Sequence, residues 1–289
     1  MADDSGVRRI LAAVDLTPMG RRVAERARLI AEETDASITL VHVVNSDASA
    51  FMSAEEQAKV RDITIQQAHD LAEWVRGRCS CSVDLVLPSG SASRHISHLA
   101  KQADVVLSGT SSLDAARVGP VTRRLARMAR VGVVAVRRQP RVPYRRVLAA
   151  VDLSERSRQA VDLARRIAPT AEVTAAYAVV SRFDEVLAAS GVSSDEIESM
   201  RNRRVASAQD AMVEFVSYWD DVKPLVVSGP PSTALAEAAR HRSSDLVTVS
   251  SKGGGGDSMV LLGAVAEEVL EAAHCDVAVA RVESVFRRP

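Results

Sequence analysis

Short apolar runs alternate along this chain with longer segments in which apolar residues recur at helical spacing. Residues 10–14 and 38–44 are apolar runs of strand length. Between them, Val23 and Ala27 fall on one face of a helix predicted over residues 18–33. The chain therefore opens with a strand, a helix and a second strand, which is the pattern of a βαβ unit.

The alternation continues to the end of the first half and then starts again. In the first half we expect a long helix over 54–76, a strand over 83–87, a helix over 93–102 and strands over 105–107 and 131–136. In the second half we expect the corresponding segments over 194–219, 224–227, 233–242, 246–249 and 276–282, with a helix over 264–273 before the last strand. Right-handed crossovers then give each half a doubly wound α/β domain, with helices on both faces of a mostly parallel five-stranded sheet of order 3-2-1-4-5.

The second half repeats the first in its sequence as well as in its pattern. Residues 8–16 read Arg-Arg-Ile-Leu-Ala-Ala-Val-Asp-Leu, and residues 145–153 read Arg-Arg-Val-Leu-Ala-Ala-Val-Asp-Leu. The repeat is far longer than the roughly 20–50 residues of a solenoid unit, so each copy is expected to be a whole domain. We place the domains at 1–140 and 141–289, each long enough to bury its own core.

Charge and apolar content exclude several classes of function. The 37 basic residues balance the 37 acidic ones, so no overall field attracts nucleic acid or an anionic membrane surface. No apolar run reaches the roughly 18 residues needed to span a bilayer, and the first residues lack a secretory signal pattern. We therefore expect a cytoplasmic protein with neither a nucleic-acid nor a membrane partner.

Cysteines and a local cluster of arginines have two interpretations each. The 3 cysteines do not form a disulfide framework, and we expect Cys79 and Cys81 to be reduced thiols, with a metal or redox pair as the alternative. The arginines lie around the prolines between the halves, and we interpret them as a solvated interdomain linker, with a patch for an anionic partner as the alternative. They are Arg137, Arg138, Arg141, Arg145 and Arg146.

Three histidines are candidates for chemistry but have simpler explanations. His95 and His98 could place two metal ligands on one helix face, yet no carboxylate or cysteine nearby completes a site. We expect a solvated face there and no metal. His42 lies in an apolar strand, where a hydrogen-bonded core or crevice histidine is favoured over a catalytic base.

Each copy places an aspartate between its first strand and first helix. Thr17 before Pro18, and Ser154 in the second copy, are suitable N-caps for the helices that follow. The caps leave Asp15 and Asp152 free to contact a ligand; alternatively, the aspartates themselves accept hydrogen bonds from the backbone.

A glycine-rich segment follows the fourth strand of the second half. Residues 250–263 read Ser-Ser-Lys-Gly-Gly-Gly-Gly-Asp-Ser-Met-Val-Leu-Leu-Gly and precede the helix over 264–273. Glycines let backbone N–H groups approach an anion, and a helix N-terminus offers unpaired donors. In a doubly wound sheet this loop would lie at the switch point beside the first strand. A phosphate site is therefore predicted, with a merely flexible loop as the alternative.

With these features the whole chain resembles a tandem universal stress protein, each half from its opening strand and aspartate to its closing strand. Members of that family that bind ATP share a loop written G-x2-G-x9-G-(S/T). Gly253 and Gly263 match its second and third glycines, whereas Ser250 replaces the first glycine and Ala264 replaces the final Ser/Thr. The missing hydroxyl removes a hydrogen bond to a charged group, of order 1.5–3 kcal/mol, so binding is expected to be weakened rather than abolished.

The resemblance also implies which residues hold the adenosine. Asp152 matches the family's aspartate at the end of strand one, and Ala178 stands where the family uses backbone at the end of strand two. Backbone at Ala264 and Val265, at the start of the last helix, would meet the phosphates.

The loop of the first half departs further from the family pattern. Gly109 fits the first glycine, but Ser112 replaces the second and the loop is shorter. Pro120 stands at the phosphate-binding Ser/Thr, and proline has no N–H to donate. We expect no nucleoside triphosphate here, although Asp15, Val43 and Gly109 can hold a nucleoside-like ligand.

The resemblance implies a stress-response protein that binds an adenine nucleotide (ATP), with or without Mg²⁺, mainly in its second domain, and acts by regulation or through a protein partner. No nucleophile elbow is present, so it is not expected to be an enzyme beyond slow ATP hydrolysis or autophosphorylation. The alternative is a degenerate scaffold that has lost nucleotide binding. The family's pairing through last strands further implies an intrachain pseudo-dimer, joined by 131–136 and 276–282, that can dimerise again.

Overall fold

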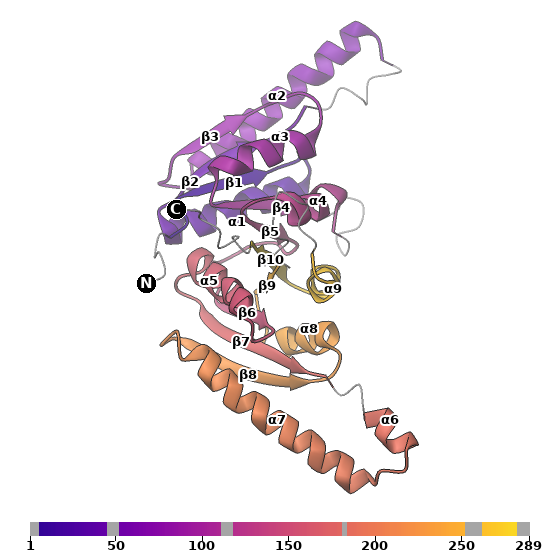
Figure 1. Ribbon diagram of the computed structural model, residues 1–289. Coiled ribbons are helices and arrows are strands. Elements are labelled where there is room, and N and C mark those ends of the chain that lie inside the picture. The colour runs from indigo at the N-terminus through magenta and orange to yellow at the C-terminus, as the bar shows by residue number, and fades with distance from the viewer. Residues whose placement is uncertain (1–5, 45–51, 111–117, 181–183, 252–261, 282–289) are drawn as a thin grey trace, which may run out of the picture.

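One continuous sheet runs through the whole molecule. The computed structural model describes residues 6–44, 52–110, 118–180, 184–251 and 262–281. Their strands form a 10-stranded sheet in the order β3-β2-β1-β4-β5-β10-β9-β6-β7-β8 (Figure 1). Each half contributes five strands in the order 3-2-1-4-5, and the second set mirrors the first across the β5–β10 junction. The predicted fold class is therefore confirmed.

The elements of the first half follow the predicted alternation. They are β1 (Arg9–Ala13), α1 (Pro18–Thr34), β2 (Ser37–Val41), α2 (Ala54–Arg76), β3 (Val83–Val86), α3 (Ala92–Leu99) with a 3₁₀ turn (Ala100–Gln102), β4 (Val105–Gly109), α4 (Pro120–Met128) and β5 (Gly132–Val136). All strand pairs within this half are parallel.

The second half repeats the helices and strands of the first with one additional α-helix, and its 3₁₀ turn lies at a different place. Its elements are β6 (Arg146–Val151), a 3₁₀ turn (Glu155–Ser157), α5 (Arg158–Ile167), β7 (Glu172–Val179), α6 (Asp184–Ala189), α7 (Ser194–Val216), β8 (Val222–Ser228), α8 (Pro231–His241), β9 (Leu246–Ser250), α9 (Ala264–Ala272) and β10 (Asp276–Ala280). The short helix α6 was not predicted from the sequence.

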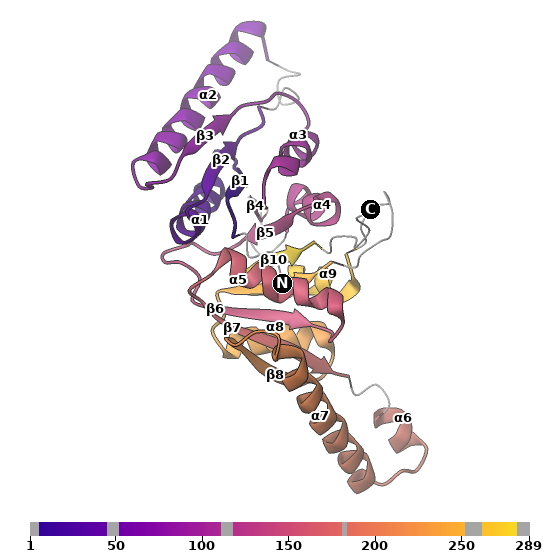
Figure 2. The same cartoon turned by 60° about the vertical axis from the view of Figure 1, so that its left-hand side comes forward.

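The two longest helices are started by the same local device. Ser53 accepts a hydrogen bond from the N–H of Glu56, whose side chain accepts in return from the N–H of Ser53, and Ser193 and Glu196 do the same for α7. Such capping boxes satisfy donors that a helix N-terminus leaves unpaired. Figures 1 and 2 show α2 and α7 extending at opposite ends of the molecule.

The halves are joined by their last strands. β5 and β10 pair antiparallel, with Ala278 opposite Val134 and Val279 opposite Val133. All these side chains are buried, and one hydrophobic cluster contains residues of both halves. The predicted pairing of 131–136 with 276–282 is thus present, and it removes two exposed sheet edges.

A buried ionic network fixes this junction from one side. Asp276 is 0% exposed, and its carboxylate forms an ion pair with Arg26 at 3.2 Å and accepts from the Tyr144 hydroxyl at 2.8 Å. It also accepts from the N–H groups of Arg137 at 2.8 Å and Arg138 at 3.1 Å. The network connects α1, the linker and β10, so it ties the first half to the second.

Two expectations from the sequence need correction. Arg137 is not part of a solvated linker, because it is buried and its guanidinium donates to the Leu270 carbonyl; the other four arginines of the cluster are exposed. Cys79 and Cys81 are joined in a disulfide rather than reduced.

Candidate functional site

A cleft of about 400 Å³ opens in the first half at the carboxyl ends of β1 and β4. It lies where the strand order reverses, the usual ligand position in doubly wound sheets, and its volume falls within the range of small-molecule sites. Asp15, Val43 and Gly109 all line it. The three residues predicted for this half are therefore brought together.

Asp15 is held by the start of α1. Its Oδ1 atom accepts from the Thr17 N–H at 3.2 Å, from the Thr17 hydroxyl at 2.6 Å and from the Gly20 N–H at 2.9 Å. The expectation that Thr17 leaves Asp15 free is therefore wrong for this oxygen, because the aspartate itself satisfies backbone donors. No described residue donates to Oδ2, which is the oxygen available to a ligand.

Gly109 is required by packing as well as by the cleft. A Cβ atom built there would lie 2.5 Å from Cγ of Met19 and 3.3 Å from Cγ2 of Val23, so α1 rests directly on the end of β4. In the second half, Ser250 ends the corresponding strand and Arg156 takes the place of Met19. Gly109 therefore leaves the space that the Met19 side chain occupies, and the second half has neither residue at these positions.

The cleft also contains polar groups that the sequence did not indicate. The hydroxyls of Ser108 and Thr122 lie 2.8 Å apart, and Thr122 donates to the Gly109 carbonyl. His42 also lines the cleft and contacts the Val14 carbonyl through Nδ1 at 3.0 Å, which agrees with the hydrogen-bonded crevice histidine expected from the sequence. A single serine or threonine gives no signal in a sequence. Aligning the two repeats would have singled out this pair, because Val249 stands at the position of Ser108 and Ala266 at the position of Thr122.

The second half places its predicted residues at the matching edge of the sheet. Asp152 follows β6, Ala178 lies near the end of β7 and Ser250 ends β9, and these strands are neighbours. Asp152 is exposed, and its Oδ1 accepts from the Ser154 N–H at 3.0 Å. Partial burial raises the pKa of Asp152, but hydrogen bonds from Ser154 and Ser157 outweigh it and lower that pKa overall.

The start of α9 is open towards this edge. Gly263 is the N-cap and has no side chain with which to cap the helix, and Ala264 and Val265 are exposed. Their N–H groups are the kind of donors that an anion meets at a helix N-terminus. Gly253, the other predicted glycine, lies outside the described residues.

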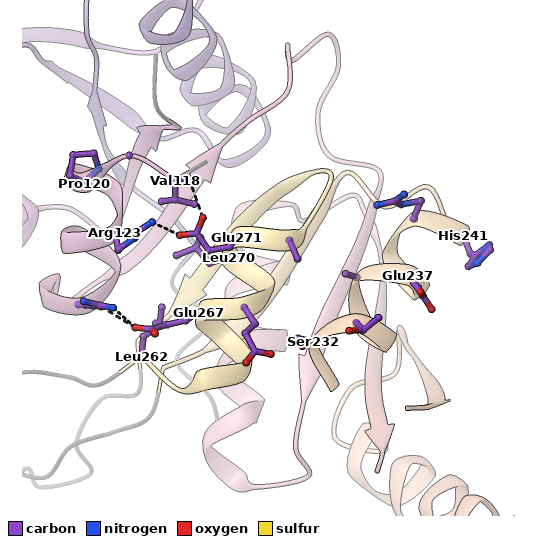
Figure 3. A pocket seen from close by; sticks show the side chains of 17 residues that line it. Val118, Pro120, Arg123, Ser232, Glu237, His241, Leu262, Glu267, Leu270 and Glu271 are labelled. Carbon is purple, nitrogen blue, oxygen red and sulfur yellow. Dashed lines mark hydrogen bonds and ion pairs between the residues drawn. The ribbon is translucent and has the colours of Figure 1, made fainter. Parts of the chain in front are cut away.

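A larger groove of about 1510 Å³ is lined by residues of α4, α8 and α9 (Figure 3). Ion pairs of 2.6 Å join Arg123 to Glu271 and Arg127 to Glu267, so a basic α4 faces an acidic α9. The Glu271 carboxylate also accepts from the Val118 N–H at 3.5 Å. Gly119 and Pro120 line both this groove and the cleft of the first half, which makes the two hollows neighbours.

Two further classes of site are not found among the described residues. No group of three or more histidine, cysteine or carboxylate side chains is arranged to hold a metal ion within these ranges. Among the same residues, none of the helices has the length and apolar content that a bilayer span requires. His95, at 3.0 Å from the Ser89 carbonyl, takes part in a local hydrogen bond rather than in a ligand set.

Comparison with known proteins agrees with this architecture. The sequence model of the universal stress protein family matches the chain twice, over residues 6–137 and 143–281. A universal stress protein of Methanocaldococcus jannaschii is 31% identical over 142 residues, which cover 48% of this chain and 82% of the relative.

Solved structures share the whole fold. A universal stress protein from Archaeoglobus fulgidus has a TM-score of 0.68 at 16% identity, covering 94% of this chain and 98% of its own. A functionally unknown protein from Pseudomonas aeruginosa has a TM-score of 0.65 at 18% identity, with 96% and 93% covered. With two matches to the family model, this chain belongs to the universal stress protein family and carries two of its domains in tandem.

Proposed function

We propose that this stress-response protein binds an adenine nucleotide, ATP above all, at the β6–β9 edge of its second half and a nucleoside-sized ligand in the cleft of its first half. The observation that carries the proposal is the formed cleft at the switch point of the first sheet, with Asp15, Val43 and Gly109 on its walls. The second half repeats this arrangement of strands with Asp152, Ala178 and Ser250.

The helix that follows the fourth strand supports assigning the phosphates to the second half. α9 begins Gly263-Ala264-Val265 and offers backbone N–H groups, whereas α4 begins with Pro120, which has none. A neutral ligand therefore suits the first cleft and a phosphorylated one suits the second.

Nucleotide binding of this kind serves regulation rather than catalysis. Turnover would be limited to slow hydrolysis or autophosphorylation, with Mg²⁺ supplied with the nucleotide. The protein acts in the cytoplasm through an unidentified protein partner, and its fused halves make the family's dimer within one chain.

The test is calorimetric titration of the nucleotide-free full-length protein. We expect ATP to fill one site and adenosine to fill two. Gly263→Val keeps a backbone conformation that valine tolerates but covers the start of α9, so it should abolish ATP binding. Gly6→Val, at a glycine where an added Cβ atom would meet nothing within 4 Å, is the matched control and should bind ATP normally.

A separate variant examines the first cleft. Ala92→Trp adds a large side chain to the cleft wall and should remove one adenosine site while leaving ATP binding intact. Unchanged ATP affinity in Gly263→Val would refute the assignment of the phosphates. Absence of any nucleotide or nucleoside binding would establish the scaffold alternative.

A further inference from the structure

A third hollow, of about 830 Å³, lies beside the junction of the halves, away from both proposed nucleotide sites. It opens where β10 ends and β5 begins, and α5 forms one wall. Arginines line it: Arg130 precedes β5, Arg281 follows β10, and Arg165 and Arg166 lie on α5. The hollow therefore collects positive charge from both halves.

Arg281 has an unsatisfied donor in this hollow. Its Nη1 atom is buried and has no hydrogen-bond partner. The Nε atom of Arg166 is also buried and also lacks a hydrogen-bond partner. Burial, followed by the nearby charge of Arg130, lowers the pKa of Arg281. A buried guanidinium N–H without an acceptor is costly, so an acceptor supplied by a ligand would be favoured.

The carboxylates that line the hollow are already engaged. Their partners are Arg9 for Asp104, Arg165 for Asp221, the Trp219 indole for Asp162 and the Thr170 hydroxyl for Glu33. Asp162 also lies within the field of Arg165 and Arg166, so it offsets part of their charge. No described carboxylate forms an ion pair with Arg281.

The other side of the junction shows what is missing. Arg137 follows β5 just as Arg281 follows β10. Arg137 has the carboxylates of Asp276 and Glu271 beside it, and both oppose the effect of burial on its pKa. Gly132, the first residue of β5, stands where Asp276 begins β10. The protein thus has a carboxylate at this position on one side of its pseudo-two-fold axis and a glycine on the other.

We propose that this hollow binds a small oxyanion, a phosphate or a carboxylate, through the Arg281 guanidinium, with Arg166 as a second donor and Arg130 adding charge. The planar fork of arginine suits both kinds of oxyanion because it can donate two parallel hydrogen bonds. The anion takes the electrostatic role that Asp276 has towards Arg137. This site differs from the nucleotide crevices in position and in residues.

The test uses the full-length protein and inorganic phosphate as the probe, with citrate as the carboxylate arm, in calorimetric titration. We expect saturable binding, and Arg281→Gln should weaken it by about tenfold or more. Arg281→Lys should retain part of the affinity, since it keeps the charge but loses the fork. Arg61→Gln, an exposed arginine on α2, is the control and should bind as the unmodified protein does.

The crossed variants separate this site from the proposed nucleotide site. Arg281→Gln should leave ATP binding unchanged, and Gly263→Val should leave phosphate binding at Arg281 unchanged. Phosphate binding that is lost in Gly263→Val but kept in Arg281→Gln would overturn the proposal, as would equal affinities in Arg281→Gln and Arg61→Gln. Circular dichroism of Arg281→Gln and Arg281→Lys confirms that both remain folded.

Discussion

Asp276 concentrates several interactions that hold the halves together. It accepts from two backbone N–H groups and the Tyr144 hydroxyl, and it neutralises Arg26, whose guanidinium stacks 3.8 Å above the Tyr144 ring. Since the carboxylate is buried, removing it leaves a charged guanidinium and several donors without an acceptor. Such losses cost more than an ion pair contributes.

We expect Asp276→Ala to lower the free energy of unfolding by about 3–5 kcal/mol, as measured by chemical denaturation. Asp221→Ala is the control, because its ion pair with Arg165 is exposed and is worth only about 0–1 kcal/mol. Equal losses of unfolding free energy in the two variants would show that the buried network stabilises the protein no more than an exposed ion pair does.

Cys275 is expected to be inert in the folded protein. It is buried, and burial, together with the charge of Asp276, raises the pKa of its thiol to about 12. Because the thiolate is the reactive form, an aromatic disulfide reagent at pH 8 should detect no thiol in the native protein. Denaturation should release one, since Cys79 and Cys81 are joined, and reduction should release all 3. Three thiols in unreduced, denatured protein would contradict the disulfide.

Residue types and spacing predicted Asp15, Val43 and Gly109 as members of the first cleft, and they left open whether Asp15 contacts a ligand or accepts backbone hydrogen bonds. Asp15 and Gly109 were recognisable from their places after strands. That Asp15 anchors Thr17 and Gly20, and that Gly109 admits Met19, depends on how closely α1 approaches the sheet. Such distances are set by tertiary packing, which a periodic pattern does not contain.

At the level of elements, periodicity placed the helices and strands well because most have one clear buried face. The helix over 54–76 agrees with α2 end to end, and its capping box marks its start in the sequence. The short helix α6 was missed, because six residues are too few to show helical spacing. Charge patterns along the linker misplaced Arg137, whose burial depends on a distant element, β10.

The packing of α1 on β4 gives a test at this scale. Gly109→Ala should cost about 1–3 kcal/mol of unfolding free energy, because the new methyl group overlaps Met19. In the double variant with Met19→Ala the space is released, so the two costs should sum to more than the measured total. Gly77→Ala, where a Cβ atom would meet only the Glu73 carbonyl at 3.4 Å, is the control. Strict additivity would show that the two residues do not interact.

For the whole molecule, the repeat in the sequence predicted two similar domains, and the family resemblance implied their joining by last strands. Neither predicted the buried ionic network on one side of the junction or the arginine-lined hollow on the other. These differences arise from substitutions between the repeats, such as Gly132 in β5 where β10 has Asp276. The effect of such a substitution depends on contacts between the two halves, which the sequence does not show.

Ala278→Asp should weaken the junction. The side chain is 0% exposed and opposite Val134, so a carboxylate there would be buried without a partner. We expect the radius of gyration from small-angle scattering to rise as the halves separate. Ala206→Asp, on exposed α7, should leave it unchanged. An unaltered radius in a folded Ala278→Asp variant would contradict the pairing.

The opposite charges of α4 and α9 decide which surfaces can meet. If α4 of one molecule packed antiparallel against α4 of another, each Arg123 would lie opposite an Arg127. Two α9 helices packed in this way would place each Glu267 opposite a Glu271. Like charges so placed repel. Divergence after the gene duplication has therefore disfavoured contacts between two copies of the same half, and the charges favour pairing of a first half with a second half.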